Sequence, residues 1–148
     1  MSVLVVAEHV RGELRPVTLE LISAARSLGG PVEVAVIARD PSAFTEAVNL
    51  EGVDEILAVR VDADEFENDV YQNAVEQLVA ERSPEVVLLG FTVSAMGYGP
   101  ALATKLGTGF ASDVFAVRHE GGELVAERSF YGAKVNGEYA QVAQIRAQ

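Results

Sequence analysis

Short apolar runs of strand length, separated by stretches with helical periodicity, constrain the fold of this chain more than any other feature of its sequence. Each run is rich in β-branched residues, and most lack strict alternation of apolar and polar residues. That pattern is typical of parallel strands that helices cover on both faces. The runs are Val3–Ala7, Val32–Ala38, Ile56–Val59 and Val86–Phe91.

The segments that follow these runs carry helix signals. Each places its apolar residues on one helical face, and residues that commonly begin or end helices bound it. The first helix is predicted to start near Pro16 and stop at Gly29-Gly30, and the second to have Asp40 as N-cap and Pro41 as its first residue. The third is predicted to have Asn68 or Asp69 as N-cap and to end at Ser83-Pro84, and the fourth to run from about Met96 to Leu106. The expected buried faces are Val17, Leu21, Ala24, Ala25 and Leu28; Phe44, Ala47 and Val48; Tyr71, Ala74, Val75, Leu78 and Val79; and Tyr98, Ala101, Leu102 and Leu106.

The pattern changes near the C-terminal end. Asp113–His119 and Glu123–Phe130 resemble strands and flank Glu120-Gly121-Gly122, which indicates a hairpin. Tyr139–Ile145 is a further candidate strand. We therefore predict a three-layer α/β fold whose mostly parallel sheet has an antiparallel β-hairpin extension after residue 112. The strands after Asp113 are not expected to continue a purely parallel sheet. Residues 1–148 contain no repeat or linker and are expected to form a single domain.

Composition excludes several classes of function. The chain has no cysteine, so disulfides, Cys-ligated metals and thiolate nucleophiles are excluded, which fits a cytoplasmic protein. The formal net charge of −11 disfavours nucleic-acid binding, because phosphate contacts need clustered Lys and Arg. The apolar runs are much shorter than a membrane span, so no membrane insertion is expected, and the first residues predict a strand and not a signal peptide.

One loop stands out as a candidate binding site, since it follows a buried strand and opens a helix at the sheet edge where α/β proteins bind ligands. The hydroxyls of Thr92 and Ser94 could bind a phosphate, and Gly97 and Gly99 would allow close approach of the backbone. The same residues also suit a capped helix start with closely packed glycines, which is the favoured interpretation. Neither the dinucleotide spacing nor the P-loop spacing is present.

Other candidate residues have simpler interpretations. Glu8 and His9 follow the first strand and could form an acid–base pair, but a polar loop is favoured because no nucleophile is near. The stretch Asp62–Asp69 is dense in carboxylates but lacks the glycine and spacing of a calcium loop, so a solvated loop is expected. His119 is expected to be solvated. We therefore predict no catalytic and no metal-ligating residues.

Taken in order, several segments resemble the α subunit of electron transfer flavoproteins. Val3–His9 (VLVVAEH), Gly12–Leu14, Thr18–Glu20 and Ala24–Gly29 resemble the start of that subunit, with Arg15 and Val17 as departures. The resemblance continues through Gly52–Leu57, the helix and turn at Gly99–Gly109, Asp113-Val114 and Arg128–Val135. Each segment is weak by itself, whereas the ordered set is fairly specific and spans nearly the whole chain.

The resemblance implies the N-terminal domain of that subunit, with an adenine-nucleotide-hydrolase-like fold. Such a domain would serve as scaffold and interface in a heterodimeric electron carrier, packed against the β subunit. A separate C-terminal domain, which is absent here, would bind FAD, so this chain alone is not expected to hold the flavin or act as an enzyme. The assembled carrier would meet a dehydrogenase or a quinone reductase. An isolated domain would expose its partner surface and could form a homodimer.

A second hypothesis is a stand-alone adenine-nucleotide-binding module resembling universal stress proteins. It rests on the same strand–helix alternation and on the loop residues Thr92, Ser94, Gly97 and Gly99.

Overall fold

The main sheet of the protein is parallel throughout. The computed structural model describes residues 1–127, 132–135 and 141–145. Six strands follow the order β5-β4-β1-β6-β11-β7, and each neighbouring pair is parallel. They are β1 (Val3–Val6), β4 (Val32–Ala38), β5 (Glu55–Arg60), β6 (Val86–Gly90), β7 (Phe110–Val114) and β11 (Gln141–Ile145). The predicted runs are confirmed as β1, β4, β5 and β6, with ends within one residue.

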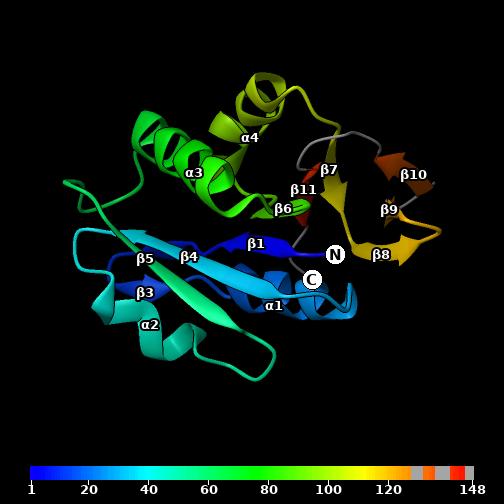
Figure 1. Ribbon diagram of the computed structural model, residues 1–148. Helices are drawn as coiled ribbons and strands as arrows, with labels where there is room; N and C mark the ends of the chain where they lie inside the picture. The colour runs from blue at the N-terminus through cyan, green and yellow to red at the C-terminus, as the bar shows by residue number, and fades with distance from the viewer. Residues whose placement is uncertain (128–131, 136–140, 146–148) are drawn as a thin grey trace.

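Helices cover both faces of this sheet (Figure 1). α1 (Val17–Ser27) and α2 (Ser42–Val48) lie on one face, and α3 (Asn68–Arg82) and α4 (Val93–Leu106) lie on the other. Successive side chains of a strand point to opposite faces, so Val5 belongs to the core beneath α1, whereas Leu4 and Val6 belong to the core beneath α3 and α4. These three layers confirm the predicted fold class.

A small antiparallel sheet contains β8 (Ala116–Glu120), β9 (Glu123–Glu127) and β10 (Gly132–Val135) in the order β10-β9-β8. Glu120 pairs with Glu123, so Gly121 and Gly122 form a two-residue turn. Their φ angles of +59° and +82° are those that a type I′ hairpin turn needs, which explains the two glycines. The predicted hairpin is therefore confirmed.

The order of the C-terminal strands differs from expectation. β7 and β11 continue the parallel sheet, and β11 lies between β6 and β7, parallel to both. The chain leaves the sheet after β7, builds the antiparallel sheet and returns as β11 between β6 and the edge strand β7. β7 also begins at Phe110, three residues before the predicted strand start, and holds Asp113 at φ +55°. Residues 128–130 and 139–140 of the predicted strands lie outside the described residues.

The N-terminal ends of three helices differ from the prediction. α4 starts at Val93 and not at Met96, because the hydroxyl of Thr92 accepts a hydrogen bond of 3.1 Å from the backbone N–H of Ala95 and caps the helix earlier. In α3 the N-cap is Glu67, which is extended at φ −129°, and not Asn68 or Asp69. In α2 the N-cap is Pro41 and not Asp40.

Two residues expected on buried helix faces are exposed. Ala47 and Ala101 both face solvent, whereas their neighbours Val48 and Leu102 are fully buried. An alanine is small enough to lie at the margin of an apolar face, where periodicity alone does not tell it from a core position.

No helix within the described ranges is both long and apolar enough to cross a membrane.

Candidate functional site

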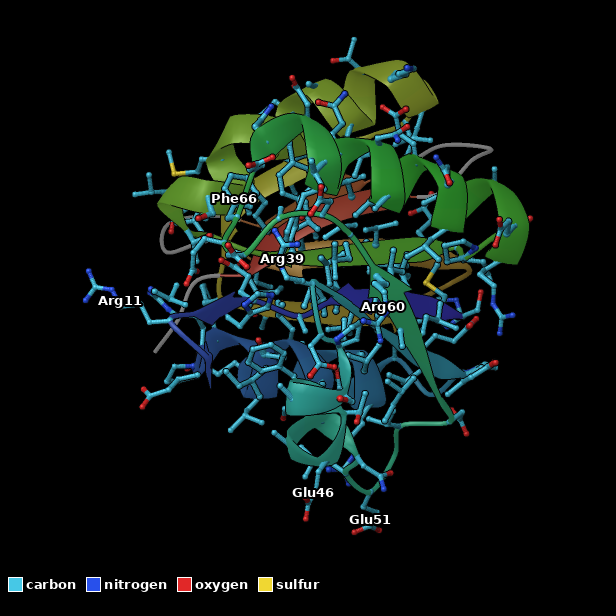
Figure 2. All side chains as sticks on the ribbon, turned by 90° about the vertical axis from the view of Figure 1, so that its left-hand side faces the viewer. Arg11, Arg39, Glu46, Glu51, Arg60 and Phe66 are labelled. Atoms are coloured by element: carbon cyan, nitrogen blue, oxygen red, sulfur yellow. The ribbon has the colours of Figure 1, made fainter. Side chains whose placement is uncertain are left out.

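A pocket of about 490 Å³ lies at the carboxyl edge of the main sheet, which is the edge where ligands bind in open α/β folds. The end of β1, the start of α1, the loop before α4 and α3 all contribute to it. Its polar and aromatic lining includes Glu8, His9, Arg15, Phe66, Tyr71, Phe91, Thr92 and Ser94. Figure 2 looks onto this edge and shows Phe66 on the side of α3 and α4, with Arg11 extending outward.

Glu8 and Thr92 form the polar centre of this pocket. The hydroxyl of Thr92 donates a hydrogen bond of 2.8 Å to Oε1 of Glu8, and the same oxygen of Thr92 accepts from Ala95 N–H. Sequence reasoning singled out Thr92 and Ser94 as phosphate-binding hydroxyls, and both line the pocket. The hydroxyl of Thr92, however, is already engaged by an internal carboxylate.

The environment of Glu8 is unfavourable for a charged carboxylate. Burial raises the pKa of Glu8, and the hydrogen bond from Thr92 and the charge of Arg15 oppose that rise. Its second oxygen, Oε2, is buried and has no hydrogen-bond partner within the described part of the chain. The backbone of Glu8 is held firmly, because its carbonyl accepts a 2.8 Å hydrogen bond from Arg15 N–H and its N–H donates to the hydroxyl of Thr18 at 3.0 Å.

His9 is buried and lies in a strand, where a polar loop was expected. It belongs to a short hairpin of β2 (His9–Val10) and β3 (Glu13–Leu14), which the sequence did not predict. Its Nε2 lies 2.8 Å from the carbonyl oxygen of Ile37, an acceptor, which assigns the proton to Nε2. The ring stacks on Phe44 with centroids 4.3 Å apart.

Tyr71 completes the arrangement around His9. Its hydroxyl donates to the carbonyl oxygen of Ile37 at 2.9 Å and lies 3.2 Å from Nε2 of His9. Burial, together with the charges of Glu8 and Glu65, raises the pKa of Tyr71 far above its ordinary value, so the hydroxyl stays protonated. Through these contacts His9 and Tyr71 join β2, α3 and the end of β4. Their role is therefore structural, which argues against an acid–base role for His9.

Gly97 and Gly99 do not line the pocket. A Cβ atom on Gly97 would come within 2.7 Å of Oδ1 of Asn68, and one on Gly99 would come within 3.1 Å of Nε2 of Gln144. Both glycines therefore allow α4 to pack closely, Gly97 against α3 and Gly99 against β11. This agrees with the favoured interpretation of closely packed glycines.

The remaining candidates are surface residues. Asp62 and Asp64 both form ion pairs of 2.5 Å with Arg39 at the end of β4, and Oε1 of Glu65 accepts from the backbone N–H of Arg11 at 2.8 Å. Across the described ranges no group of three His, Asp or Glu side chains could hold a metal ion. His119 is exposed on β8, as expected.

Comparison with known proteins agrees with the resemblance seen in the sequence. The sequence profile of the electron transfer flavoprotein domain matches residues 3–146. The chain is 46% identical over 141 residues to the electron transfer flavoprotein subunit alpha of Methylophilus methylotrophus, covering 93% of this chain and 44% of that protein. It is 31% identical over 154 aligned positions to the subunit of the same name from Mycobacterium tuberculosis, covering 99% of this chain and 47% of that protein.

A more distant relative is a subunit of an enzyme. The chain is 26% identical over 140 residues to the lactate dehydrogenase (NAD(+),ferredoxin) subunit LctC of Acetobacterium woodii, covering 90% of this chain and 34% of that protein. The chain thus spans less than half the length of the relatives it matches. The profile match over nearly all of its residues shows that the chain belongs to the electron transfer flavoprotein family.

Proposed function

We propose that this chain is the N-terminal domain of an electron transfer flavoprotein α subunit and serves as a scaffold and interface in a heterodimeric, FAD-containing electron carrier of the cytoplasm. The observation that carries the proposal is the 46% identity to such a subunit across 93% of the chain. In this proposal residues 1–148 form one domain. The electron donor or acceptor, a dehydrogenase or a quinone reductase, meets the assembled carrier and not this domain alone.

In this proposal FAD is held elsewhere in the carrier. A flavin dinucleotide needs donors for its pyrophosphate, and helix N-termini commonly supply them. At the start of α4 the pocket instead presents the carboxylate of Glu8, bound to the hydroxyl of Thr92. The groups in this pocket therefore do not fit the pyrophosphate of FAD. The proposal accordingly assigns no catalytic residue to this chain, and His9 and Tyr71 are structural residues in it.

The β subunit is proposed to cover the mouth of this pocket. Three apolar side chains of that region are exposed, namely Val10 by 39%, Val93 by 91% and Met96 by 51%. Val93 and Met96 are three residues apart on α4 and share one helical face. Exposed apolar groups that cluster in this way are typical of a protein interface. In the absence of the partner the same face could support a homodimer.

Co-expression with the β subunit of the same organism tests the proposal. A tagged 148-residue chain should retain the β subunit through affinity and size-exclusion chromatography. Purified alone, it should show no stoichiometric flavin absorbance in the visible spectrum. A flavin spectrum from the isolated chain, or complete failure to retain the β subunit, would overturn the division of roles proposed here.

The alternative of a stand-alone adenine-nucleotide module has no support from the relatives compared above. Of its four residues, Gly97 and Gly99 serve helix packing, and the hydroxyl of Thr92 donates to Glu8.

A further inference from the structure

We propose that the outer edge of β5 is a contact surface for a second copy of this chain, which pairs its own β5 antiparallel to it about a two-fold axis. The main sheets of the two copies then join into one continuous sheet. This surface is separate from the exposed face of Val93 and Met96 that is proposed above for the β subunit, and the inference does not rest on the electron-transfer assignment.

β5 is an edge strand of the main sheet, with β4 as its one neighbour within the described part of the chain (Figure 1). A strand that pairs on one side leaves a row of unpaired N–H and C=O groups on the other, which is a template for pairing with another chain. Proteins commonly protect such edges with charged residues or proline. The middle of β5, Ile56–Val59, contains neither, so its edge is open to a second strand.

A hollow of about 770 Å³ lies between β5 and α3. Contacts at both ends of α3 place this helix over β4: the hydroxyl of Tyr71 donates to the carbonyl oxygen of Ile37 at 2.9 Å. At the other end, Arg82 forms an ion pair of 2.6 Å with Glu33. Every residue from Ile56 to Asp62 lines the hollow, and successive side chains of a strand point to opposite faces. The hollow therefore reaches the outer edge of β5 and gives a second strand access to it.

The pairing of β5 with β4 decides which backbone groups of β5 point outward. The N–H of Val61 donates to the carbonyl oxygen of Ala38 at 3.0 Å, and alternate residues of a parallel strand bond to the same neighbour. Ile56 and Ala58 therefore point their N–H and C=O groups away from β4. About a two-fold axis at Leu57, Ile56 of each copy lies opposite Ala58 of the other, and each such pair exchanges both N–H···O bonds.

This register also places opposite charges across the contact. Arg60 of one copy lies opposite Asp54 of the other, and the two-fold symmetry repeats the pair. Both residues are exposed, and each bonds a backbone group of its own chain, which leaves further donors on the guanidinium and a further acceptor on the carboxylate. Glu55, the other charged residue of β5, is paired with Arg82 of its own chain. The edge is thus complementary to itself in hydrogen bonds and in charge, which favours a second copy as its partner.

Sedimentation equilibrium of the 148-residue chain tests the proposal. We expect the wild type to form dimers at concentrations up to roughly 1 mM. Arg60→Asp sets two carboxylates opposite each other at both ends of the contact, and Asp54→Arg sets two guanidinium groups there. Each variant alone should therefore dimerise at least roughly fivefold more weakly than the wild type. An equimolar mixture of the two variants restores both pairs of opposite charge and should dimerise as the wild type does.

Ala58→Lys tests the strand pairing itself. Ala58 is exposed, and a lysine in the middle of an edge strand opposes pairing, so this variant should also dimerise at least roughly fivefold more weakly. Arg11→Asp is the matched control for Arg60→Asp, since it makes the same change in net charge at an exposed residue of the hairpin between β2 and β3. It should dimerise as the wild type does.

Four outcomes would overturn the proposal: a wild type that stays monomeric, an equal loss of dimer in Arg11→Asp and Arg60→Asp, a mixture of the two folded charge variants that stays monomeric, or a dimer that Val93→Asp abolishes and Ala58→Lys leaves intact. The last result would place the contact on the exposed face of α4. Circular dichroism establishes that each variant is folded. Should Asp54→Arg not fold, Arg60→Asp and Ala58→Lys provide the test without the mixture.

Discussion

Thr92 and Glu8 are 84 residues apart in the sequence and are joined by a hydrogen bond of 2.8 Å from the hydroxyl of Thr92 to Oε1 of Glu8. This bond connects the end of β1 to the start of α4 and holds the carboxylate of Glu8 in the pocket. Substitution of either residue therefore tests both the fold and the pocket.

Replacing Thr92 should destabilise the protein. Thr92→Val keeps the shape of the side chain but removes the cap of α4 and the donor to Glu8, at an expected cost of about 1–2 kcal/mol in the free energy of unfolding. Urea denaturation monitored by circular dichroism measures this. Thr104→Val is the control, since that exposed hydroxyl donates to the carbonyl of Pro100 within the same helix. An equal loss in both variants would contradict the special role of Thr92.

Glu8 should make stability depend on pH in the opposite sense to a salt-bridged carboxylate. Its pKa in the folded state is raised above the ordinary value of 4.5, so the folded protein holds this proton more tightly than the unfolded chain. The contribution to stability is fully present below about pH 4.5 and is lost as the pH rises through the folded-state pKa. Compared with Glu8→Gln, the wild type should lose stability as the pH rises from 4.5 toward neutrality.

Unfolding measured for both proteins across that pH range isolates this effect, because the other carboxylates are common to both. A difference that does not change with pH, or one that grows in favour of the wild type as the pH rises, would contradict the raised pKa.

Gly97 should not tolerate a larger residue while Asn68 is present. Gly97→Ala would place its Cβ 2.7 Å from Oδ1 of Asn68 and should cost about 1–3 kcal/mol. On an Asn68→Ala background the same change should be neutral or stabilising by up to about 1 kcal/mol, because alanine favours a helix over glycine. A double-mutant cycle by urea denaturation measures the coupling. Independent, additive effects would show that the two residues do not oppose each other.

Substitutions of the two glycines in the hairpin turn should have different effects on the free energy of unfolding. Type I′ turns favour asparagine followed by glycine, so Gly121→Asn should change the free energy of unfolding by no more than about 0.5 kcal/mol. Gly122→Val should cost about 1–2 kcal/mol, since a β-branched residue is strained at φ +82°. Thermal unfolding of both variants measures the difference, and equal effects would argue against this turn type.

Val93 should matter for assembly and not for stability. Its side chain is 91% exposed, so Val93→Asp should leave the free energy of unfolding within about 0.5 kcal/mol of the wild type while weakening retention of the β subunit. Leu50→Asp is the control, because Leu50 is also an exposed apolar residue but follows α2 at the opposite edge of the sheet. Unchanged retention with Val93→Asp would place the interface elsewhere.

Local sequence signals determined much of this protein. The β-branched runs located β1, β4, β5 and β6 to within one residue, and the pair Gly121-Gly122 located the hairpin. Ordered resemblance to a known subunit identified the family. These features depend on residues close together in the chain, where periodicity, turn chemistry and composition act directly.

Tertiary structure alone decided the remainder. β11 enters between β6 and β7, Glu8 takes the start of α4, His9 is buried against Phe44, and Gly97 faces Asn68. Each of these depends on a contact between residues distant in sequence, and no local pattern encodes which distant group a side chain will meet. The same loop residues could have bound a phosphate or an internal carboxylate, and only the packing of β1 beside β6 brought Glu8 within reach of Thr92.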